Sequence, residues 1–411
     1  MERLVFHIDV NSAFLSWEAA RRVKNGEEDI RLVPSCISGN PERRTSVILA
    51  KSIPAKEYGV KTGDPIGSAI RKCPHLIIAK PDFLLYQKYS SLFMDICREY
   101  TPVVEKYSID ECFMDMSGTS LLYPDPIKTA YEIKDRIKNE LGFTVNIGIG
   151  PNKLLAKTAG DFEKPDKVHT LFFEELPKKF WTLPVSSLFG VGHSTEEKLI
   201  RSGISTVGKL SQISLKTLKS IFGDKMGKQL HRSSLGIDDS PVLGEPPKAK
   251  GYSISTTLEY DISDTDTALQ ILLSLSDAVS SRMRSEDNKA RTVSVFIRSS
   301  DFINHSHQKK LTAHTDITDD IYKTAKELLF DLWNKKTPIR LLGVSLTDLS
   351  KESVEQMSFF EESENKEKAK NIDRTVDNIR KRYGSSSISR LGSYKDDGKI
   401  GKKYKAEIDK E

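Results

Sequence analysis

The sequence predicts an α+β fold built from three successive parts. Up to residue 150, the predicted elements follow the order strand, helix, inserted segment, helix, two strands, helix and strand, which is typical of a ferredoxin-like split βαβ unit. Residues 168–235 are mainly helical and contain the glycine-rich stretch Leu188-Phe189-Gly190-Val191-Gly192. After a linker at 237–250, rich in proline and glycine, residues 251–349 again predict strands, with two helices.

An apolar strand opens the chain and leads directly into a helix. Four of the five residues Leu4–Ile8 are apolar, the exception being His7, and Asp9 ends the strand. We expect Asn11 or Ser12 to cap the following helix and Gly26 to end it. The unpaired N–H groups of the first turn then lie beside Asp9 and form an anion site suited to a triphosphate.

The inserted segment and the next helix have clear local signals. Thr45–Ala50 predicts a strand, and Ile53 opens a short helix with a proline near its first position. Leu84–Tyr100 predicts an amphipathic helix. The side chains expected on its buried face are Leu85, Tyr89, Leu92, Phe93 and Ile96.

A β-hairpin carries two adjacent acids. The β-prone runs 103–107 and 112–116 flank Asp110 and Glu111. Adjacent residues of a strand point to opposite faces, so two successive carboxylates are difficult to bury unless a cation compensates them. Asp-Glu pairs are also common in ordinary turns. Together with Asp9, however, Asp110 and Glu111 provide three acids at two strand ends, and such a set can hold two Mg²⁺ ions about 3.5–4 Å apart.

The remaining elements follow from caps and periodicity. Pro126 begins a helix that ends at Gly142, a strand follows at 144–149, and the next helix begins near Lys153. Later helices are expected at Asp266–Ser285 and Ile317–Asn334, and strands at 291–298 and 340–346.

Composition narrows the class of protein. The 411 residues are enough for several domains, and 37% hydrophobic with 29% charged residues indicates a globular chain. No apolar run approaches the ~18 residues of a membrane span. We therefore expect no membrane partner. The four cysteines lie far apart without the spacing of a metal site, which predicts reduced thiols in a cytoplasmic protein. A net charge of +5 permits a nucleic-acid partner without requiring one.

Two motifs carry a resemblance to a known family. His7-Ile8-Asp9-Val10-Asn11-Ser12-Ala13-Phe14 and Ser108-Ile109-Asp110-Glu111 resemble the two metal-binding motifs of the Y-family translesion DNA polymerases, especially the bacterial members. The resemblance runs in order from the first strand to about residue 360. It implies a right-hand polymerase with a ferredoxin-like palm, small fingers, a helix-hairpin-helix thumb and a C-terminal α/β little finger. The corresponding ranges are 1–26 and 81–165 for the palm, 27–80 for the fingers, 166–236 for the thumb, 237–250 for a linker, 251–349 for the little finger and 350–411 for a tail.

The resemblance also assigns site residues. It implies that Asp9, Asp110 and Glu111 hold two Mg²⁺ with help from the carbonyl of Val10. Phe14, which the sequence alone would place in the core, becomes the residue that selects deoxynucleotides. The triphosphate would contact the segment Ser12, Ala13 and Phe14 together with Lys56 and Lys164, and the DNA backbone would contact Gly190 and Gly192.

One pair of positions departs from the family pattern. Bacterial relatives usually carry Tyr and Arg where this chain has Ile53 and Lys56. Lysine keeps the positive charge but lacks the bidentate fork of arginine, and Ile53 cannot donate a hydrogen bond.

The segment after the little finger has its own signal. Gln356, Met357, Phe359 and Phe360 stand between polar stretches and resemble the peptides with which bacterial polymerases bind the sliding clamp. Beyond residue 361, the mixed charges predict a mobile tail with one helix at 373–383.

The predicted function is template-directed DNA synthesis during damage bypass. Its expected partners are primer–template DNA, deoxynucleoside triphosphates and a sliding clamp, and the protein is expected to be a monomer. Two alternatives stay open. A palm-type nucleotidyl cyclase would share the first unit without needing a thumb or little finger, and an inactive protein that only binds DNA or clamp would not need all three acids.

Overall fold

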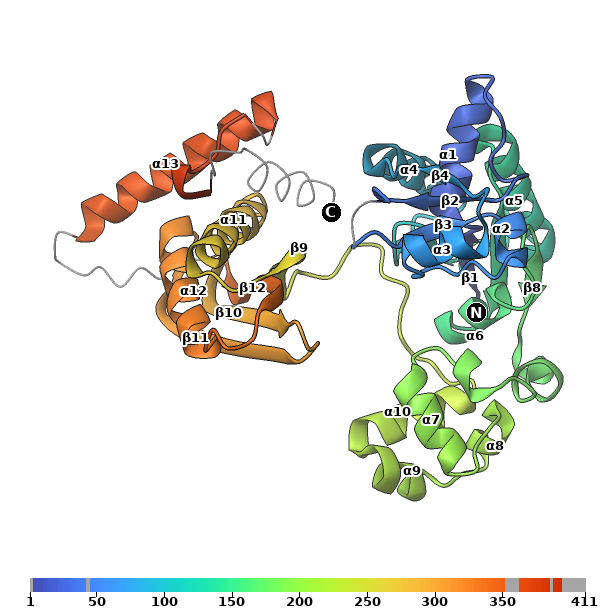
Figure 1. Ribbon diagram of the computed structural model, residues 1–411. Helices are drawn as coiled ribbons and strands as arrows, with labels where there is room; N and C mark the ends of the chain where they lie inside the picture. Colours follow the sequence, from blue (N-terminus) through green and yellow to red (C-terminus); the bar gives the residue numbers. More distant parts are fainter. Residues whose placement is uncertain (1–2, 42–44, 352–361, 385–386, 394–411) are drawn as a thin grey trace. The chain divides into compact units, whose positions relative to one another are not determined.

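The computed structural model describes residues 3–41, 45–351, 362–384 and 387–393, which form two compact units. The first unit extends to Pro247 and the second begins at Lys248 (Figure 1). None of the described helices is long and apolar enough to cross a lipid bilayer.

A five-stranded sheet forms the centre of the first unit, with the order β5-β6-β1-β7-β8. Strand β1 (Val5–Val10) pairs antiparallel with β6 (Glu111–Asp115) and with β7 (Val145–Gly150), and β5 (Val104–Lys106) completes the predicted hairpin. The first four strands have the ferredoxin-like order. The edge strand β8 (Val168–Thr170) was not predicted, and the sheet therefore continues past residue 165.

Helices cover both faces of this sheet. On one face, α1 (Ala13–Lys24), α4 (Phe83–Tyr100) and α5 (Pro126–Leu141) enclose a large apolar core. On the other face, α6 (Lys153–Gly160) packs closely on β7 and β1. Gly148 and Gly160 permit this approach, because a Cβ atom on Gly148 would lie 2.0 Å from the carbonyl oxygen of Ala156.

Two local expectations in this unit were wrong. Leu92 is 37% exposed because α4 turns Tyr86, Phe93 and Cys97 inward instead. The expected side-chain cap of α1 is absent: Ser12 adopts a left-handed conformation with φ 49°, and its hydroxyl makes no capping bond. The Asn11 side chain donates to Asn146 of β7 and accepts from the Asp166 N–H, so it ties the turn to β7 and to the segment just before β8.

The inserted segment forms a small subdomain with its own core. Its three strands, β2 (Ser35–Ser38), β3 (Ile48–Lys51) and β4 (Ile77–Ala79), have the order β3-β2-β4. They pack with α2 (Ile53–Glu57) and α3 (Ile66–Lys72) around a small apolar cluster.

A helical module follows β8. After short 3-10 and π turns at 173–180 and 185–187, it contains α7 (His193–Arg201), α8 (Val207–Ser211), α9 (Leu215–Phe222) and α10 (Asp224–Ser234). Leucine, isoleucine, valine and phenylalanine side chains from these helices share one core with α6.

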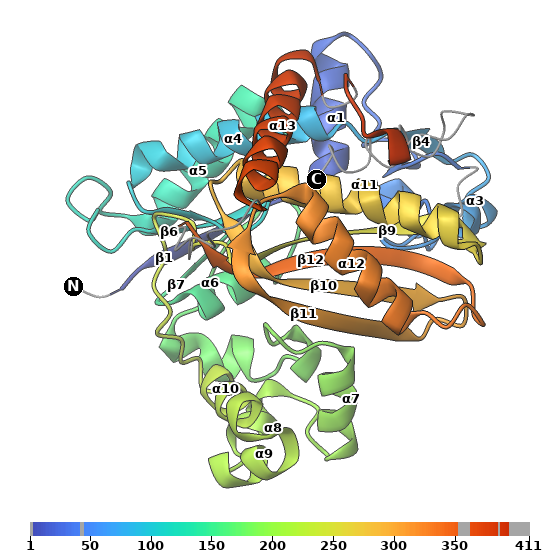
Figure 2. The same ribbon diagram turned by 90° about the vertical axis from the view of Figure 1, so that its left-hand side faces the viewer.

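The second unit is an antiparallel sheet with two helices on one face. The order β11-β10-β12-β9 comes from β9 (Gly251–Ile262), β10 (Lys289–Ser299), β11 (Asn304–Thr315) and β12 (Ile339–Ser350). Figure 2 shows α11 (Thr265–Arg284) and α12 (Thr318–Leu332) lying over this sheet, and their apolar side chains share one core with it.

The C-terminal helix differs from the predicted tail. Helix α13 spans Glu362–Tyr383, twice the predicted length, and it is docked on the second unit. Arg284 of α11 donates to Asp377 at 2.7 Å, and Arg380 donates to Asp277 of α11 at 2.7 Å. Paired, largely buried charges therefore hold a segment whose composition had indicated mobility. The predicted clamp-binding residues 356–360 lie outside the described residues.

Candidate active site

Alternation along β1 decides which side chains face the site. Phe6, Ile8 and Val10 point into the large core beneath α1, α4 and α5. Val5 packs with Ala156 of α6, and His7 approaches Gly160 of the same helix. Because alternate residues of a strand share a face, Asp9 lies on this second face, beyond the end of α6.

The pairing of β1 with β6 brings the predicted acids together. Asp9 is directly opposite Glu111 in the antiparallel register. Asp110 precedes β6, and its carbonyl oxygen accepts a hydrogen bond from the Val10 N–H at 2.9 Å. The carboxylate of Asp110 accepts from the Ser108 hydroxyl, which lies in the same turn. The three acids predicted from two distant segments thus meet at the edge of the sheet that is formed by the ends of the interior strands β1 and β6.

Each of the two opposed acids binds a lysine. Lys164 donates to Asp9 and also pairs with Asp161 at 2.8 Å. Lys157 of α6 donates to Glu111, which also contacts the Nε2 atom of His7 at 2.8 Å. The ammonium groups compensate carboxylates that are 19% and 14% exposed.

Burial and these partners shift the acidities in opposite directions. Burial raises the pKa of Asp9 above its usual value, and attraction to Lys164 only partly opposes this effect. Burial also favours neutral Glu111, but hydrogen bonds from His7 and Lys157 outweigh it and lower the pKa of Glu111 to about 2. For Lys164, burial favours the neutral amine, yet Asp9 and Asp161 raise its pKa. Negative charge at this edge thus depends on nearby cations.

The donor set suits a hard divalent cation. Carboxylate and carbonyl oxygens are the ligands that Mg²⁺ prefers, and the sheet edge provides three carboxylates beside the backbone of Val10. Within the described ranges, no group of three or more His, Cys, Asp or Glu side chains is drawn together as a metal site. Here Asp9 and Glu111 each bind a lysine ammonium, a monovalent cation on a flexible side chain.

Phe14 lies at the start of α1 and is half-buried. Its ring stacks on Tyr86 with centroids 4.7 Å apart and an interplanar angle of 16°, and its edge meets Phe83 at 6.1 Å. The ring therefore packs against the core while part of it stays accessible. Ser12 is exposed and Ala13 is buried at the same helix start, where the first N–H groups have no partner within the helix.

The other residues predicted to contact phosphates make no hydrogen bond or ion pair with the three acids in the part of the chain that the structure describes. Lys56 is an exposed residue of α2, and the described side chains give it no hydrogen bond or ion pair to the three acids. Ile53 is 58% exposed on the same helix. Gly190 has a φ of 89°, a conformation that favours glycine, and Gly192 caps the start of α7.

Two residues at this edge were missed in the sequence. His7 shares a strand face with Asp9, two positions away, so the alternation of β1 could have revealed it. Lys157 lies over the rings of Tyr107 and Phe189 at 5.6 and 5.5 Å while it binds Glu111. Only the tertiary packing of α6 and the helical module reveals that contact.

Comparison with known proteins identifies the family. A model described as the impB/mucB/samB family matches residues 8–161, one for its C-terminal domain matches 249–359, and one described as DNA polymerase-iota, thumb domain, matches 186–238. DNA polymerase IV of Clostridium acetobutylicum is 44% identical over 95% of this chain and 98% of its own length. This chain belongs to the Y family of DNA polymerases. DNA polymerase IV 2 of Bacillus subtilis is 36% identical over 98% of this chain and 99% of its own length.

The fold agrees with that of a solved Y-family structure. A Y-family DNA polymerase chimera matches with a TM-score of 0.71 and 21% identity, covering 84% of this chain and 98% of its own. The predicted α+β polymerase fold is thereby confirmed.

Proposed function

We propose that this protein is a DNA-directed DNA polymerase that extends primers by a two-metal mechanism and copies past damaged template bases. The observation that carries the proposal is the meeting of Asp9, Asp110 and Glu111 at one sheet edge in a chain of the Y family. In the reaction, the primer 3′-hydroxyl attacks the α-phosphorus of a deoxynucleoside triphosphate, a new phosphodiester bond forms, and pyrophosphate leaves.

The three acids and the carbonyl of Val10 are the residues that would hold Mg²⁺. When bound, two such ions lower the pKa of the attacking hydroxyl and neutralise charge on the triphosphate. The chain's own groups bind and orient the substrate. Lys164 and the N–H groups at the start of α1 bind phosphate oxygens, and Lys56 provides further positive charge.

Phe14 acts as the sugar selector in this proposal. The stack on Tyr86 and the edge contact with Phe83 hold its ring in place at the helix start. A fixed ring beside the sugar would collide with a 2′-hydroxyl, which disfavours ribonucleotides.

We assign the remaining parts by the same reasoning. Residues 1–26 and 81–170 act as the palm, five residues more than the sequence predicted because β8 belongs to its sheet, 27–80 as the fingers, 171–236 as the thumb and 251–349 as the little finger, with 237–250 as linker. Gly190 and Gly192 let thumb N–H groups approach the DNA backbone. The protein acts as a monomer in the bacterial cytoplasm, and Gln356, Met357, Phe359 and Phe360 tether it to the sliding clamp.

Primer extension tests the proposal. With Mg²⁺ and all four deoxynucleotides, we expect extension on an undamaged template and across an abasic site, and none with Asp110→Ala. Purified protein incubated with ATP or GTP without DNA should form no cyclic nucleotide, which separates this function from a cyclase. Binding of DNA or clamp without any extension would instead show an inactive binding protein. Phe359→Ala with Phe360→Ala should keep extension and lose its stimulation by loaded clamp.

A further inference from the structure

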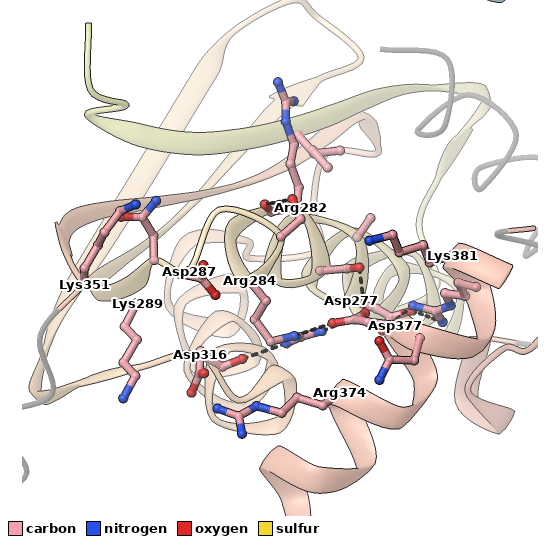
Figure 3. A pocket seen from close by; sticks show the side chains of 17 residues that line it. Asp277, Arg282, Arg284, Asp287, Lys289, Asp316, Lys351, Arg374, Asp377 and Lys381 are labelled. Carbon is pink, nitrogen blue, oxygen red and sulfur yellow. Dashed lines mark hydrogen bonds and ion pairs between the residues drawn. The ribbon is translucent and has the colours of Figure 1, made fainter.

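Buried polar side chains join distant segments in both units. In the second unit the joining groups are charged: Arg284 of α11 donates to Asp377 of α13 at 2.7 Å, and Figure 3 shows its guanidinium turned toward that carboxylate. In the first unit a neutral pair does the same. Asn146 of β7 is fully buried, Asn11 directly after β1 is 9% exposed, and their side chains bond to each other at 3.1 Å. Asn11 lies two residues after Asp9, so this pair borders the candidate active site.

The side chain of Asn146 uses its full hydrogen-bonding capacity. An amide side chain has two donor hydrogens and an oxygen that accepts two bonds. The Nδ2 atom of Asn146 donates to the carbonyl oxygens of Gly160 and Glu163 at 3.1 and 2.6 Å. Its Oδ1 atom accepts from the Nδ2 atom of Asn11 at 3.1 Å and from the Lys167 N–H at 3.4 Å. A buried amide that is satisfied at all four positions holds its partners in one arrangement.

Asn11 extends the same network along the loop 160–167. Its Oδ1 atom accepts from the N–H of Asp166 at 3.0 Å. The carboxylate of Asp166 is in turn bound by Lys134 and Lys138 of α5 at 2.8 and 2.7 Å. The loop is therefore attached both to the asparagine pair and to α5.

Lys164 occupies the middle of this loop. The bonds of the asparagine pair end on Glu163, directly before it, and on Asp166, two residues after it. The ammonium group of Lys164 pairs with Asp9 and, at 2.8 Å, with Asp161. Because the lysine side chain is long and flexible, the place of its ammonium group depends on where its backbone is held. The asparagine pair holds that backbone beside the strand end that carries Asp9.

We propose that Asn146 and Asn11 are positioning residues that set the place of Lys164 for binding the triphosphate. The inference rests on the proposed function, in which Lys164 binds phosphate oxygens. Asn146 is fully buried, so it acts through Lys164 and not by contact with the substrate. A loop that is fixed before the nucleotide arrives loses less freedom on binding, and this gain appears as affinity for the nucleotide.

The test compares Asn146→Ala with a matched control in the full-length protein. Asn146→Ala leaves two loop carbonyls without their donor, so the loop can shift. Asn152→Ala is the control, because Asn152 is also buried and also bonds to backbone groups, but at the start of α6. Its Nδ2 atom donates to the Gly236 carbonyl, and its Oδ1 atom accepts from the Leu155 N–H. Single-nucleotide incorporation at saturating primer–template gives KM and kcat for dNTP.

We expect Asn146→Ala to raise KM for dNTP about five- to tenfold and to lower kcat less than about threefold, since a loosened loop misplaces a binding group and leaves the three acids in place. Competitive inhibition by inorganic tripolyphosphate should weaken by the same factor, because this probe has phosphates without sugar or base. Asn152→Ala should change each constant less than about twofold. An unchanged KM in Asn146→Ala, or equal increases in both variants, would overturn the inference.

A double-mutant cycle shows whether the effect passes through Lys164. Lys164→Ala alone should raise KM about tenfold or more. Adding Asn146→Ala should then raise KM by less than about twofold, because a residue that acts through another has no effect once that residue is gone. Effects of the two changes that multiply would contradict the positioning role, and so would a Lys164→Ala enzyme with the KM of the wild type.

Two features keep the result interpretable. KM does not depend on the fraction of enzyme that is folded, and Asn146→Ser, which keeps one donor, should give a KM between those of the wild type and Asn146→Ala. A serine variant with a higher KM than the alanine variant would contradict the role of the donor. Failure of the wild-type protein to extend any primer would refute the proposed function, whereas an Asn146→Ala effect that is undiminished without Lys164 refutes only this inference.

Discussion

The two units each contain a cluster of poorly exposed charges, but the cations differ. One cluster lies at the proposed catalytic edge, where β1 ends and β6 begins. There Lys157 and Lys164 face Glu111 and Asp9, respectively. Between α11 and α13, the buried acids pair with arginines: Arg284 binds Asp377 and Asp373, and Arg380 and Arg390 bind Asp277. Lysine is a point charge on a flexible stem, whereas the arginine fork fixes a carboxylate bidentately.

The type of cation distinguishes the carboxylates of the two clusters, because a lysine can move away more easily than a bidentate arginine. Lys164 is 38% exposed and holds Asp9 through one ammonium group on a flexible side chain. Asp373 is 3% exposed, accepts from the Thr318 N–H at 2.8 Å and contacts Arg284 and Arg390. We propose that the first cluster exchanges its cations, whereas the arginine pairs of the second hold α13 against α11.

The largest effect is expected from removing charge at the exchangeable cluster. Glu111→Gln keeps the shape of the side chain but loses a metal ligand, which should cost about 4 kcal/mol, or roughly 10³-fold in incorporation rate. Affinity for primer–template should change little, because phosphate contacts elsewhere provide it. Single-turnover extension and anisotropy measure the two quantities. Glu99→Gln, an exposed position of α4, is the control, and a Glu111→Gln enzyme as active as this control would contradict the assignment.

Breaking the fixed cluster should affect stability instead. Arg284→Ala removes the α11 arginine from Asp373 and Asp377, and loss of one member of a buried pair costs about 3–5 kcal/mol. Amide hydrogen exchange should rise sharply in α13 and in the last turns of α11, while incorporation at saturating DNA stays near wild type. Lys326→Ala on the exposed face of α12 should leave exchange unchanged. Protection of α13 that survives Arg284→Ala would mean that apolar contacts hold the helix.

A variant of Phe14 tests whether this ring, which packs against the core, also selects the sugar of the incoming nucleotide. Phe14→Ala should relax discrimination against ribonucleotides by about tenfold or more, since the ring no longer occupies the space of the 2′-hydroxyl. Tyr89→Ala removes a ring of α4 that packs on Phe143 and has no ring contact with Phe14, and it should leave sugar selection intact. Matched dNTP and rNTP kinetics decide between them, and equal changes in both variants would assign Phe14 to packing alone.

The smallest expected effect concerns the departure from the family pattern on α2. Ile53→Tyr with Lys56→Arg adds a hydroxyl and a bidentate donor at exposed positions, and it should lower the KM for dNTP by about two- to fivefold. Steady-state kinetics with each single change as control will show this. An unchanged or higher KM would mean that α2 does not approach the triphosphate.

Much of the fold followed from local signals, and the exceptions share a physical cause. Asp9 and Asp110-Glu111 could be placed because strand ends and a tight hairpin are short-range features. The length and docking of α13 could not, because Asp373, Asp377 and Arg380 recur at helical spacing as charges, and periodicity detects apolar stripes. Their partners on α11 lie about a hundred residues earlier, and only tertiary structure pairs them. Lys157 was missed because its contact with Glu111 depends on the packing of α6, whereas the alternation of β1 could have revealed His7.

The central claim is that Mg²⁺ replaces Lys157 and Lys164 at the proposed catalytic edge during nucleotide incorporation. The direct measurement is single-nucleotide incorporation as a function of free Mg²⁺, with DNA and dNTP saturating, for the wild type and for Asp9→Asn. We expect no incorporation in excess EDTA, a rate that rises with an apparent order above one at low Mg²⁺, and a large rightward shift or complete loss in Asp9→Asn. Incorporation that persists in EDTA, or an Asp9→Asn curve that overlays the wild type, would contradict it.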